Sequence, residues 1–461
     1  MVTVAAAVLT IAGVIHLGGA WLSPLGVEST AAPQHASGVL AQFLDNSRSP
    51  LAHLILQLVV IVLAARALGA LAGRLGQPAV IGEIASGVLL GPSLVGWIAP
   101  GFSAFLFPDA SMPSLQLLSQ IGVLFFMFLV GLALEPSHLR GRAQTAIAVS
   151  HFSIVIPFVL GVTLSLALYR QYAPPAVPFF AFALFCGVAM SITAFPVLAR
   201  ILEDRGLTYT PLGNTAITAA AVDDVTAWSI LAFVVAVTTA GGAVVTLFAI
   251  VTLSVVFVLL MVFVCRPLLE RVLNVDRMGD TFSKGRSAIV LSGLLTCALI
   301  TEIIGIHGLF GAFVAGAIMP RGAAFRSMLR DRIETFSSVL LLPIFFAYTG
   351  LRTQIGLLDE VSHWAMCLAI IVVATAGKLG GTVVAARWTG LPWRESLALG
   401  ALMNTRGLME LIALNVGYNL GILTPEIFTM MVLMALVTTA MTGPLLTIIL
   451  RSDPVRVGGA T

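Results

Sequence analysis

Long apolar stretches follow one another from residue 51 almost to the end of the chain. A helix that crosses the hydrocarbon core of a bilayer needs about 20 mostly apolar residues. Only helices and closed barrels satisfy their backbone polar groups inside a membrane. We therefore predict an all-α membrane protein whose thirteen candidate spans lie near residues 51–72, 78–98, 114–134, 144–169, 178–200, 212–236, 243–265, 286–304, 306–320, 335–351, 364–386, 395–417 and 427–450.

The composition supports a membrane environment and excludes several other classes of protein. The chain is 59% hydrophobic and only 10% charged, whereas a soluble domain carries about 25% charged residues. A net charge of +3 is too small to indicate a nucleic-acid partner. The four cysteines lie inside apolar runs without a CxxC motif, so we interpret them as small buried hydrophobic residues.

The ends of the chain add two short parts to a membrane domain over residues 51–450. The apolar run 3–22 has no basic flank, which favours a retained extra helix, although a signal peptide cleaved around Ala31-Ala32 is the alternative. Polar residues to position 50 form an external connector, and residues 451–461 form a short tail. No stretch between the spans is long enough for a soluble domain.

The basic residues are distributed unevenly between the loops. With the thirteen spans, the loops on one side carry eighteen of the 24 lysines and arginines, the other side carries three, and three lie within spans. Positive charge accumulates in cytoplasmic loops. We therefore expect a multi-pass protein of the cell membrane with a cytoplasmic C-terminus.

Two segments of the chain are similar to one another. LLSQIGVLFFMFLVGLALEP (117–136) and SSVLLLPIFFAYTGLRTQI (337–355) share an aromatic pair, then Gly-Leu, then a polar end. Each precedes a long span, a broken-looking span and a further helix, and the two sets begin on opposite sides of the membrane. Such inverted repeats are typical of secondary transporters, whose broken helices surround a binding site near the bilayer midplane.

Two adjacent carboxylates lie in the apolar run AAAVDDVTAW (219–228), at Asp223 and Asp224. An ionisable residue at the bilayer centre costs about 2.5–3.5 kcal/mol, so it indicates function. Neighbours on a helix point about 100° apart, so one can face a cavity and the other a helix. A buried carboxylate near a like charge holds a proton or a monovalent cation, but not easily both. The alternative is a packing pair satisfied by hydroxyls such as Thr218 or Thr226.

Lys378 is the only lysine within a span, in the run IIVVATAGKLGGTVVA. A buried lysine needs a carboxylate partner or loses its proton. Whichever acid of the pair does not face the cavity, Asp223 or Asp224, is the natural partner. Apolar residues on both sides place Lys378 too deep for its amine to reach the interface.

Two spans contain polar residues that predict broken helices. SITAFPVLAR (191–200) holds Ser191, Thr193 and Pro196, and a proline frees a backbone carbonyl that hydroxyls or ions can satisfy. A simple proline kink is the alternative.

The corresponding span of the second repeat contains MNTRGLMELI (403–412), with Asn404, Thr405, Arg406 and Glu410. Arg406 and Glu410 have the i, i+4 spacing of a salt bridge. We expect this pair to neutralise the end of a broken helix, with direct ion binding as the alternative. Of the remaining acids, Glu83 is a packing acid or part of an access path, and Glu302 is solvated near an outer turn.

Together these features resemble the second cation:proton antiporter family, which includes the Kef-type, NapA-type and plant CHX-type exchangers. The resemblance covers about residues 51–450. It rests on QPAVIGEIASGVLLGPS (77–93), GVLFFMFLVGLALEP (122–136), SITAFPVLARIL (191–202), AAAVDDVTAW (219–228), GLFGAFVAGAIMP (308–320), AGKLGGT (376–382) and NTRGLMELI (404–412).

The resemblance implies the NhaA-like antiporter fold and a homodimer of elevator-like transporters. Each protomer would contain a dimerisation part and a six-helix core formed by about residues 144–236 and 364–450, with two crossed broken helices. By this resemblance Asp224 is the principal cation and proton carrier and Asp223 pairs with Lys378. Ser191 and Thr193 lie at the first break, and Arg406 lies at the second.

The subgroups of the family leave the transported ion open between Na⁺ and K⁺. Kef-type chains carry Gln-Asp at the acidic pair and add a cytosolic nucleotide-binding domain. The given sequence contains no stretch for such a domain, so we do not expect gating by glutathione or nucleotide. The Asp-Asp pair with a core lysine resembles sodium-handling, electrogenic members. NTRGLMELI resembles the CHX type, where potassium is common, although many CHX-type chains have Lys at Arg406.

We therefore expect an antiporter that exchanges Na⁺ or K⁺ for protons, surrounded by lipid and without a cofactor. An organic-anion carrier of similar fold is the main alternative, and Arg406 is the group that favours it. A channel would not need titrating carboxylates. An intramembrane enzyme is disfavoured, because His151 is the only histidine near mid-span and neither HExxH nor GxSxG occurs.

Overall fold

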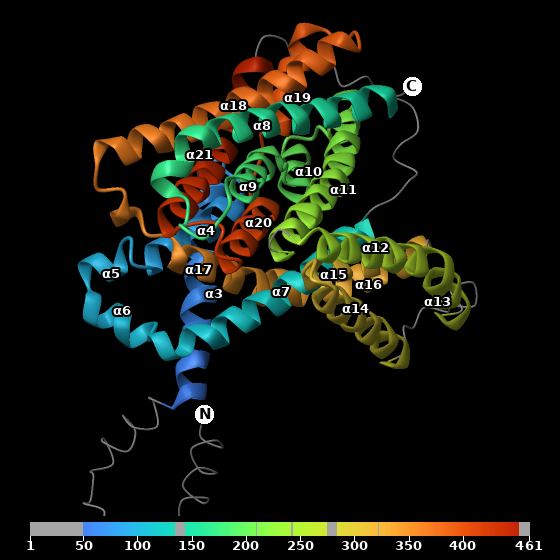
Figure 1. Cartoon of the computed structure of the whole chain (residues 1–461), viewed down its shortest axis with the longest axis horizontal. Coiled ribbons are helices and arrows are strands. Elements are labelled where there is room, and N and C mark those ends of the chain that lie inside the picture. The colour runs from blue at the N-terminus through green and yellow to red at the C-terminus, as the bar shows by residue number, and fades with distance from the viewer. Residues whose placement is uncertain are drawn as a thin grey trace, which may run out of the picture. The chain divides into compact units, whose positions relative to one another are not determined.

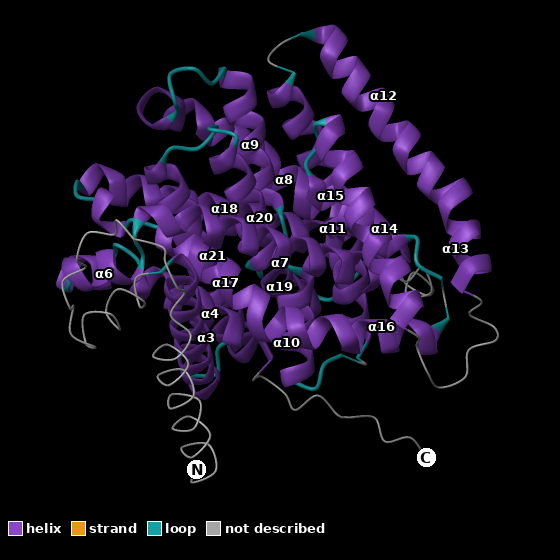
Figure 2. Cartoon of the chain, turned by 90° about the horizontal axis from the view of Figure 1, so that it is seen from below, coloured by secondary structure: helices purple, strands orange, loops and turns teal. Residues whose placement is uncertain are grey.

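The computed structural model describes residues 49–133, 143–208, 210–240, 243–273, 284–320 and 322–450. Within these ranges the chain is helical, with short loops and no strand (Figure 2). The all-α prediction is thus confirmed. The predicted helix over 3–22 and the tail 451–461 lie outside the described residues, as does nearly all of the external connector.

The helices follow the predicted order along the chain. Short 3-10 or π turns occur at Asp109–Ser111, Met261–Cys265, Ser337–Leu341 and Ile355–Leu357. The helices are α3 (Pro50–Arg74), α4 (Ala79–Leu90), α5 (Val95–Ile98), α6 (Pro100–Leu106), α7 (Met112–Ala133), α8 (Ala143–Tyr172), α9 (Phe179–Ser191), α10 (Phe195–Asp204), α11 (Pro211–Thr239), α12 (Val244–Leu260), α13 (Arg266–Leu273), α14 (Lys284–Ile304), α15 (Gly308–Ala317), α16 (Ala323–Phe336), α17 (Leu342–Arg352), α18 (Val361–Trp388), α19 (Trp393–Met403), α20 (Leu408–Asn419) and α21 (Pro425–Leu450).

The helix starts follow simple local rules. Proline is the first residue of α3, α11 and α21, where its missing N–H needs no partner within the helix. Thr210 precedes α11, and its hydroxyl accepts a hydrogen bond from the Gly213 N–H at 3.1 Å. The positions of Pro and Thr in the sequence thus account for where the helix with the two aspartates begins.

Eleven helical segments of the described chain are long and apolar enough to cross a membrane, and the bent pair α19–α20 makes a twelfth. The thirteenth predicted span, 306–320, is helical only over Gly308–Ala317, which is ten residues. Ten residues of α-helix extend about 15 Å, half of a bilayer core. The thirteen predicted segments are therefore helical, but α15 by itself is too short to span.

The two repeats are arranged in opposite directions, as the sequence predicts. The first runs through α7, α8, the pair α9–α10 and α11, and the second through α17, α18, the pair α19–α20 and α21. The long helices α8 and α18 lie side by side (Figure 1). Gly377 of α18 lies against Pro157 and Gly381 lies against Phe152, so the two helices are antiparallel.

Close glycine contacts join α4 to α17 and α7 to α15, and they connect the two halves of the chain. A Cβ at Gly87 of α4 would lie 2.5 Å from the Phe346 carbonyl oxygen of α17, and a Cβ at Gly350 would collide with Gly87. Gly131 of α7 and Gly316 of α15 make an equivalent contact. Small residues let membrane helices approach this closely. Each contact joins α7 or α17 to a short helix from the other half of the chain.

Helices α8–α11 and α18–α21, called the core helices below, pack chiefly on one another. The remaining described helices, called the scaffold helices, include α4, α7, α15 and α17. The segment Phe179–Asp204, which contains α9 and α10, is the most buried of the described spans. Both broken helices therefore lie inside the core bundle, where the polar residues singled out in the sequence come together.

Candidate functional site

The first break separates α9 from α10. Helix α9 ends at Ser191, the backbone is extended at Ile192, and α10 begins at Phe195. Thr193 therefore lies within the break, and Pro196 lies in the first turn of α10. At that position proline removes no helical hydrogen bond. It marks the start of the second half-helix instead of kinking a continuous one.

The second break separates α19 from α20, which are bent by 42°. Asn404, Thr405 and Arg406 lie between the two half-helices and are fully buried. Gly407 precedes α20 with a φ of 151°, in a region that only glycine adopts without strain. The Arg-Gly dipeptide thus makes a sharper break than the one in the first repeat.

The two breaks touch each other at the centre of the core. The Ala194 N–H donates a hydrogen bond to the Thr405 carbonyl oxygen at 3.0 Å. The Thr193 hydroxyl donates to the Met403 carbonyl oxygen at 3.3 Å. Free backbone groups of one broken helix are therefore satisfied by the other, as crossed broken helices require.

Asp223 of α11 is completely buried and well partnered. Its Oδ1 accepts a hydrogen bond from the Ser153 hydroxyl at 2.8 Å, and its Oδ2 accepts one from the Thr193 N–H at 3.0 Å. The Lys378 Nζ lies 3.2 Å from Oδ2, and both side chains are fully buried. The carboxylate thus caps the positive end of α10, and the expected pairing of Lys378 with one aspartate is present.

The positively charged side chains of Lys378 and Arg406 lie at the C-terminal end of α9, which is the negative end of that half-helix. The Lys378 amine donates to the Ser191 carbonyl oxygen. The Arg406 guanidinium donates to the carbonyl oxygens of Ala189, at 2.9 Å, and Met190. Arg406 also lies 3.2 Å from Glu410, and both are fully buried. Arg406 therefore does satisfy a broken-helix end, but it is the end of α9 and not of its own helix.

Asp224 differs from its neighbour in having an oxygen without a partner. The residue is only 1% exposed, and its Oδ1 is buried without a hydrogen-bond partner among the described residues. The Oδ1 of Asn404 at the second break is buried and unpartnered in the same sense. An ionised carboxylate in such a place is very unfavourable until it binds a proton or a cation.

The donors available for a cation are few. No group of three or more His, Cys, Asp or Glu side chains that could hold a metal ion occurs in the described part of the chain. Asp223 is engaged by Lys378, which leaves Asp224 as the free acid of the pair. A single buried carboxylate of this kind can bind a proton or a cation, but not easily both.

Threonines of α21 hold the second break and were missed in the sequence. Thr439 Oγ1 accepts a hydrogen bond from the Arg406 N–H at 2.9 Å and donates to the Arg406 carbonyl oxygen at 2.7 Å. Thr405 Oγ1 donates to Thr442 Oγ1 at 3.3 Å. A signal was present, because Val-Thr-Thr at 437–439 of α21 corresponds to Val-Asp-Asp at 222–224 of α11. Ser153 had no such signal.

The two remaining acids lie away from this centre. Glu83 lines a cavity of about 770 Å³ that also reaches Pro196 and Leu408, the first turns of α10 and α20. The Arg66 guanidinium lies 3.9 Å from it. Glu302 is 62% exposed but accepts a hydrogen bond from the Gly308 N–H at 2.6 Å. Glu302 therefore also caps α15, whereas the sequence predicted only a solvated carboxylate.

Comparisons with known proteins agree with this architecture. The family model of the transmembrane sodium/hydrogen exchangers matches residues 58–452. The "Na(+)/H(+) antiporter NhaS4" of Synechocystis is 47% identical over 84% of this chain and 95% of that protein. The "Cation/H(+) antiporter 17" of Arabidopsis thaliana is 41% identical over 86% of this chain. The "K(+)/H(+) antiporter 1" of Saccharomyces cerevisiae is 34% identical over 87% of this chain.

The relatives differ in length. The chain spans about half of the plant and yeast proteins, 49% and 47% of their residues. The relatives named above are antiporters by name, which confirms the expectation that the chain is not an enzyme.

A solved structure shows the same fold. The sodium proton antiporter MjNhaP1 of Methanocaldococcus jannaschii has a TM-score of 0.58 and 17% identity, with 86% of this chain and 96% of that chain covered. This likeness concerns the fold and supports the NhaA-like arrangement expected from the sequence. The match over nearly the whole described region and the identity to the Synechocystis protein show that the chain belongs to the sodium/hydrogen exchanger family.

Proposed function

We propose that this chain exchanges a monovalent cation for protons across a membrane, with Asp224 as the shared binding site. The observation that carries the proposal is that the two aspartates differ in their hydrogen-bond partners. Asp223 has a hydroxyl, a backbone N–H and the Lys378 amine as partners. Asp224 is equally buried but has an unpartnered oxygen. The names of the relatives support a cation and a proton as the exchanged species.

The exchange follows from the cost of a lone buried charge. An ionised Asp224 needs a cation beside it, and without one it binds a proton. Cation and proton therefore compete for one carboxylate. Asp223 would remain paired with Lys378. Glu410 is engaged by Arg406, which gives that pair a structural role.

The cavities on the two sides of the broken helices differ in size in this structure. The cavity of about 770 Å³ reaches the start of both second half-helices. At the other end of the core helices a cavity of about 30 Å³ holds little more than one water. Arg200 and Arg205, which line the large cavity, belong to a loop that the charge count places inside. We infer an inward-facing state, with a cytoplasmic C-terminus.

Alternating access would then require the core helices to move against the scaffold helices as a rigid body. The core bundle, residues 144–236 and 364–450, is the proposed moving part. The remaining helices would supply the interface of a homodimer in the cell membrane. If two protons exchange for one sodium ion, each cycle moves one net charge, worth about 2.3 kcal/mol per 100 mV.

The organic-anion alternative loses its main support. It relied on Arg406 as a free basic group. In the structure the guanidinium is fully buried, donates to two carbonyls of α9 and pairs with Glu410. A cation at the acidic pair is therefore the better substrate.

The test uses proteoliposomes with an acidic interior and an enclosed pH-sensitive dye. We expect external Na⁺ or K⁺ to raise the interior pH with the wild type and to have no effect with Asp224→Asn. The matched control is Asp331→Asn, because Asp331 is exposed on α16 and lies among the lining residues of neither cavity. An Asp224→Asn variant that still transports would contradict the proposed site. A folded wild type that responds to no monovalent cation would contradict the function.

A further inference from the structure

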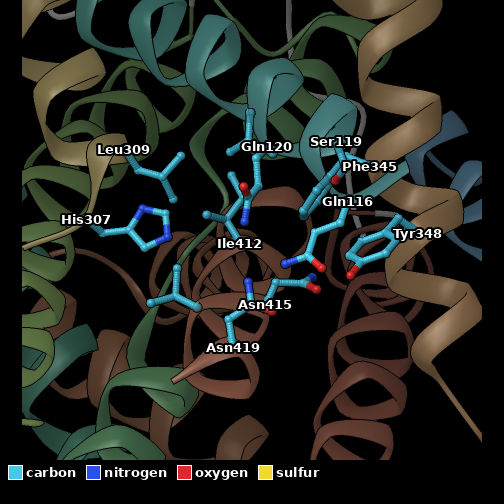
Figure 3. A pocket seen from close by; sticks show the side chains of 12 residues that line it. Gln116, Ser119, Gln120, His307, Leu309, Phe345, Tyr348, Ile412, Asn415 and Asn419 are labelled. Atoms are coloured by element: carbon cyan, nitrogen blue, oxygen red, sulfur yellow. The ribbon is translucent and has the colours of Figure 1, made fainter. Parts of the chain in front are cut away.

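A polar cluster joins the scaffold to the core at the end opposite the large cavity. The cavity of about 30 Å³ lies there between α7, α17 and α20, with His307 from the α14–α15 turn (Figure 3). Tyr348, Asn415 and Asn419 point toward this cavity from α17 and α20 (Figure 3). The cation site does not use these residues.

Arg352, at the C-terminal end of α17, is the centre of the cluster. Its guanidinium donates a hydrogen bond to Asn419 Oδ1 at 2.7 Å and a longer one to Asn415 Oδ1 at 3.4 Å. The guanidinium carbon lies 4.3 Å from the centre of the Tyr348 ring and 4.8 Å from the centre of the Tyr418 ring. Hydrogen bonds from a charged donor and cation–π contacts are among the stronger polar interactions.

A further hydrogen bond crosses the same interface. Asn415 Nδ2 donates to the Thr349 hydroxyl of α17 at 2.8 Å. Asn415 is buried, so the bond is shielded from water. The contacts of α17 with α20 therefore combine one charged and several neutral groups over the last two turns of both helices.

The two helices so joined belong to parts that would move separately. Helix α17 is fixed to α4 through the Gly87–Gly350 contact. Helix α20 is the second half of a broken helix and begins directly after Gly407. Any displacement of α20 that opened the small cavity would have to separate Arg352 from Asn419 and Tyr418.

We propose that Arg352 is the gate residue at this end of the transporter. Its contacts with α20 hold the small cavity closed while the large cavity is open. Its positive charge also disfavours a cation in the closed gate, because like charges repel. The proposal rests on the alternating access inferred above and adds the residue that controls one of its two openings.

The experiment measures opening directly and does not depend on transport. The four native cysteines are replaced by alanine, and a single cysteine is introduced by Ser119→Cys on α7. Ser119 lines the small cavity and is 2% exposed. The protein is placed in lipid nanodiscs, and the rate of reaction with a charged maleimide is measured. We expect Arg352→Ala to increase this rate at least about tenfold.

A second reporter separates gating from general loosening. Ser338→Cys lies in the large cavity, which should close as the small cavity opens. We expect Arg352→Ala to slow the reaction there. Arg170→Ala is the control, because Arg170 is exposed in the last turn of α8, and it should change neither rate. Unchanged rates in Arg352→Ala, or faster reaction at both reporters, would overturn the gate. A wild type without antiport activity would leave these labelling rates measurable and would contradict the proposed function alone.

Discussion

The two broken helices have the same place in their repeats but different chemistry around them. The first break is surrounded by Asp223 and Lys378, and Arg406 reaches it from the second repeat. The second break is held by neutral hydroxyls of α21. Where α11 has Val-Asp-Asp, α21 has Val-Thr-Thr. Ionisable groups from both repeats thus gather around the first break, whereas neutral hydroxyls hold the backbone of the second break.

Only the first break requires buried charged side chains to satisfy its backbone groups. Backbone groups at the second break are satisfied by neutral groups, namely the Thr439 hydroxyl and donors of the first break. Around the first break, cations satisfy the carbonyls of α9, and each cation needs a carboxylate. The first break is therefore more sensitive to the loss of a single side chain.

The largest expected effect is that of Lys378→Met. This change leaves Asp223 buried without its counter-charge and the Ser191 carbonyl without its donor. We expect the free energy of unfolding to fall by about 3–5 kcal/mol, the usual cost of breaking a buried ion pair. Thermal unfolding of purified protein in detergent measures the change against wild type.

A double variant sharpens this test. Adding Asp223→Asn to Lys378→Met removes the stranded charge. The Asn oxygen can still accept from the Thr193 N–H, and its amide can donate to the Ser153 hydroxyl. We expect most of the lost stability to return, because neutral replacements of a buried pair are often tolerated. A double variant no more stable than Lys378→Met would show that the ion pair does not explain the loss.

A smaller effect is expected from Gly407→Ala at the second break. The φ of 151° strains any residue with a Cβ, and an added Cβ would lie 3.2 Å from Val197 Cγ2. We expect a loss of about 1–3 kcal/mol. Ala194→Gly at the first break is the comparison, because Ala194 has a φ of −94° and needs no glycine. Equal losses for the two variants would mean that the breaks do not differ in backbone strain.

Much of the fold could be predicted because membrane helices are recognisable from the length and hydropathy of apolar runs in the sequence. The order of the helices, the inverted repeats and both breaks follow from apolar runs interrupted by Pro, Gly and charge. The length of α15 did not follow, because Ile306 before it and Ile318 and Met319 after it are as apolar as the helix itself. Its start depends on the turn at His307 and on the Glu302 cap, which hydropathy does not reveal.

The site residues that could be predicted are those whose burial in a membrane span costs free energy. Residues without such a cost were missed. Asp223, Asp224, Lys378 and Arg406 stand out because few ionisable groups occur in the spans. Which carbonyls Arg406 would satisfy could not be predicted, because they lie 216 and 217 residues away in the chain. Thr439 is inconspicuous in an apolar helix, where threonine often bonds only to its own helix.

The smallest expected effect concerns this threonine and its neighbour. Thr439 makes two hydrogen bonds to the Arg406 backbone, whereas the Thr438 hydroxyl donates only to Met434 and Ala435 of its own helix. At about 1 kcal/mol for each hydrogen bond, Thr439→Val should lower the free energy of unfolding by about 1–2 kcal/mol. Thr438→Val, of the same shape and burial, should leave it nearly unchanged, and the two melting temperatures compare them directly. If both changes were neutral, the neutral framework of the second break would not depend on α21, and the backbone contacts between the breaks would hold it alone.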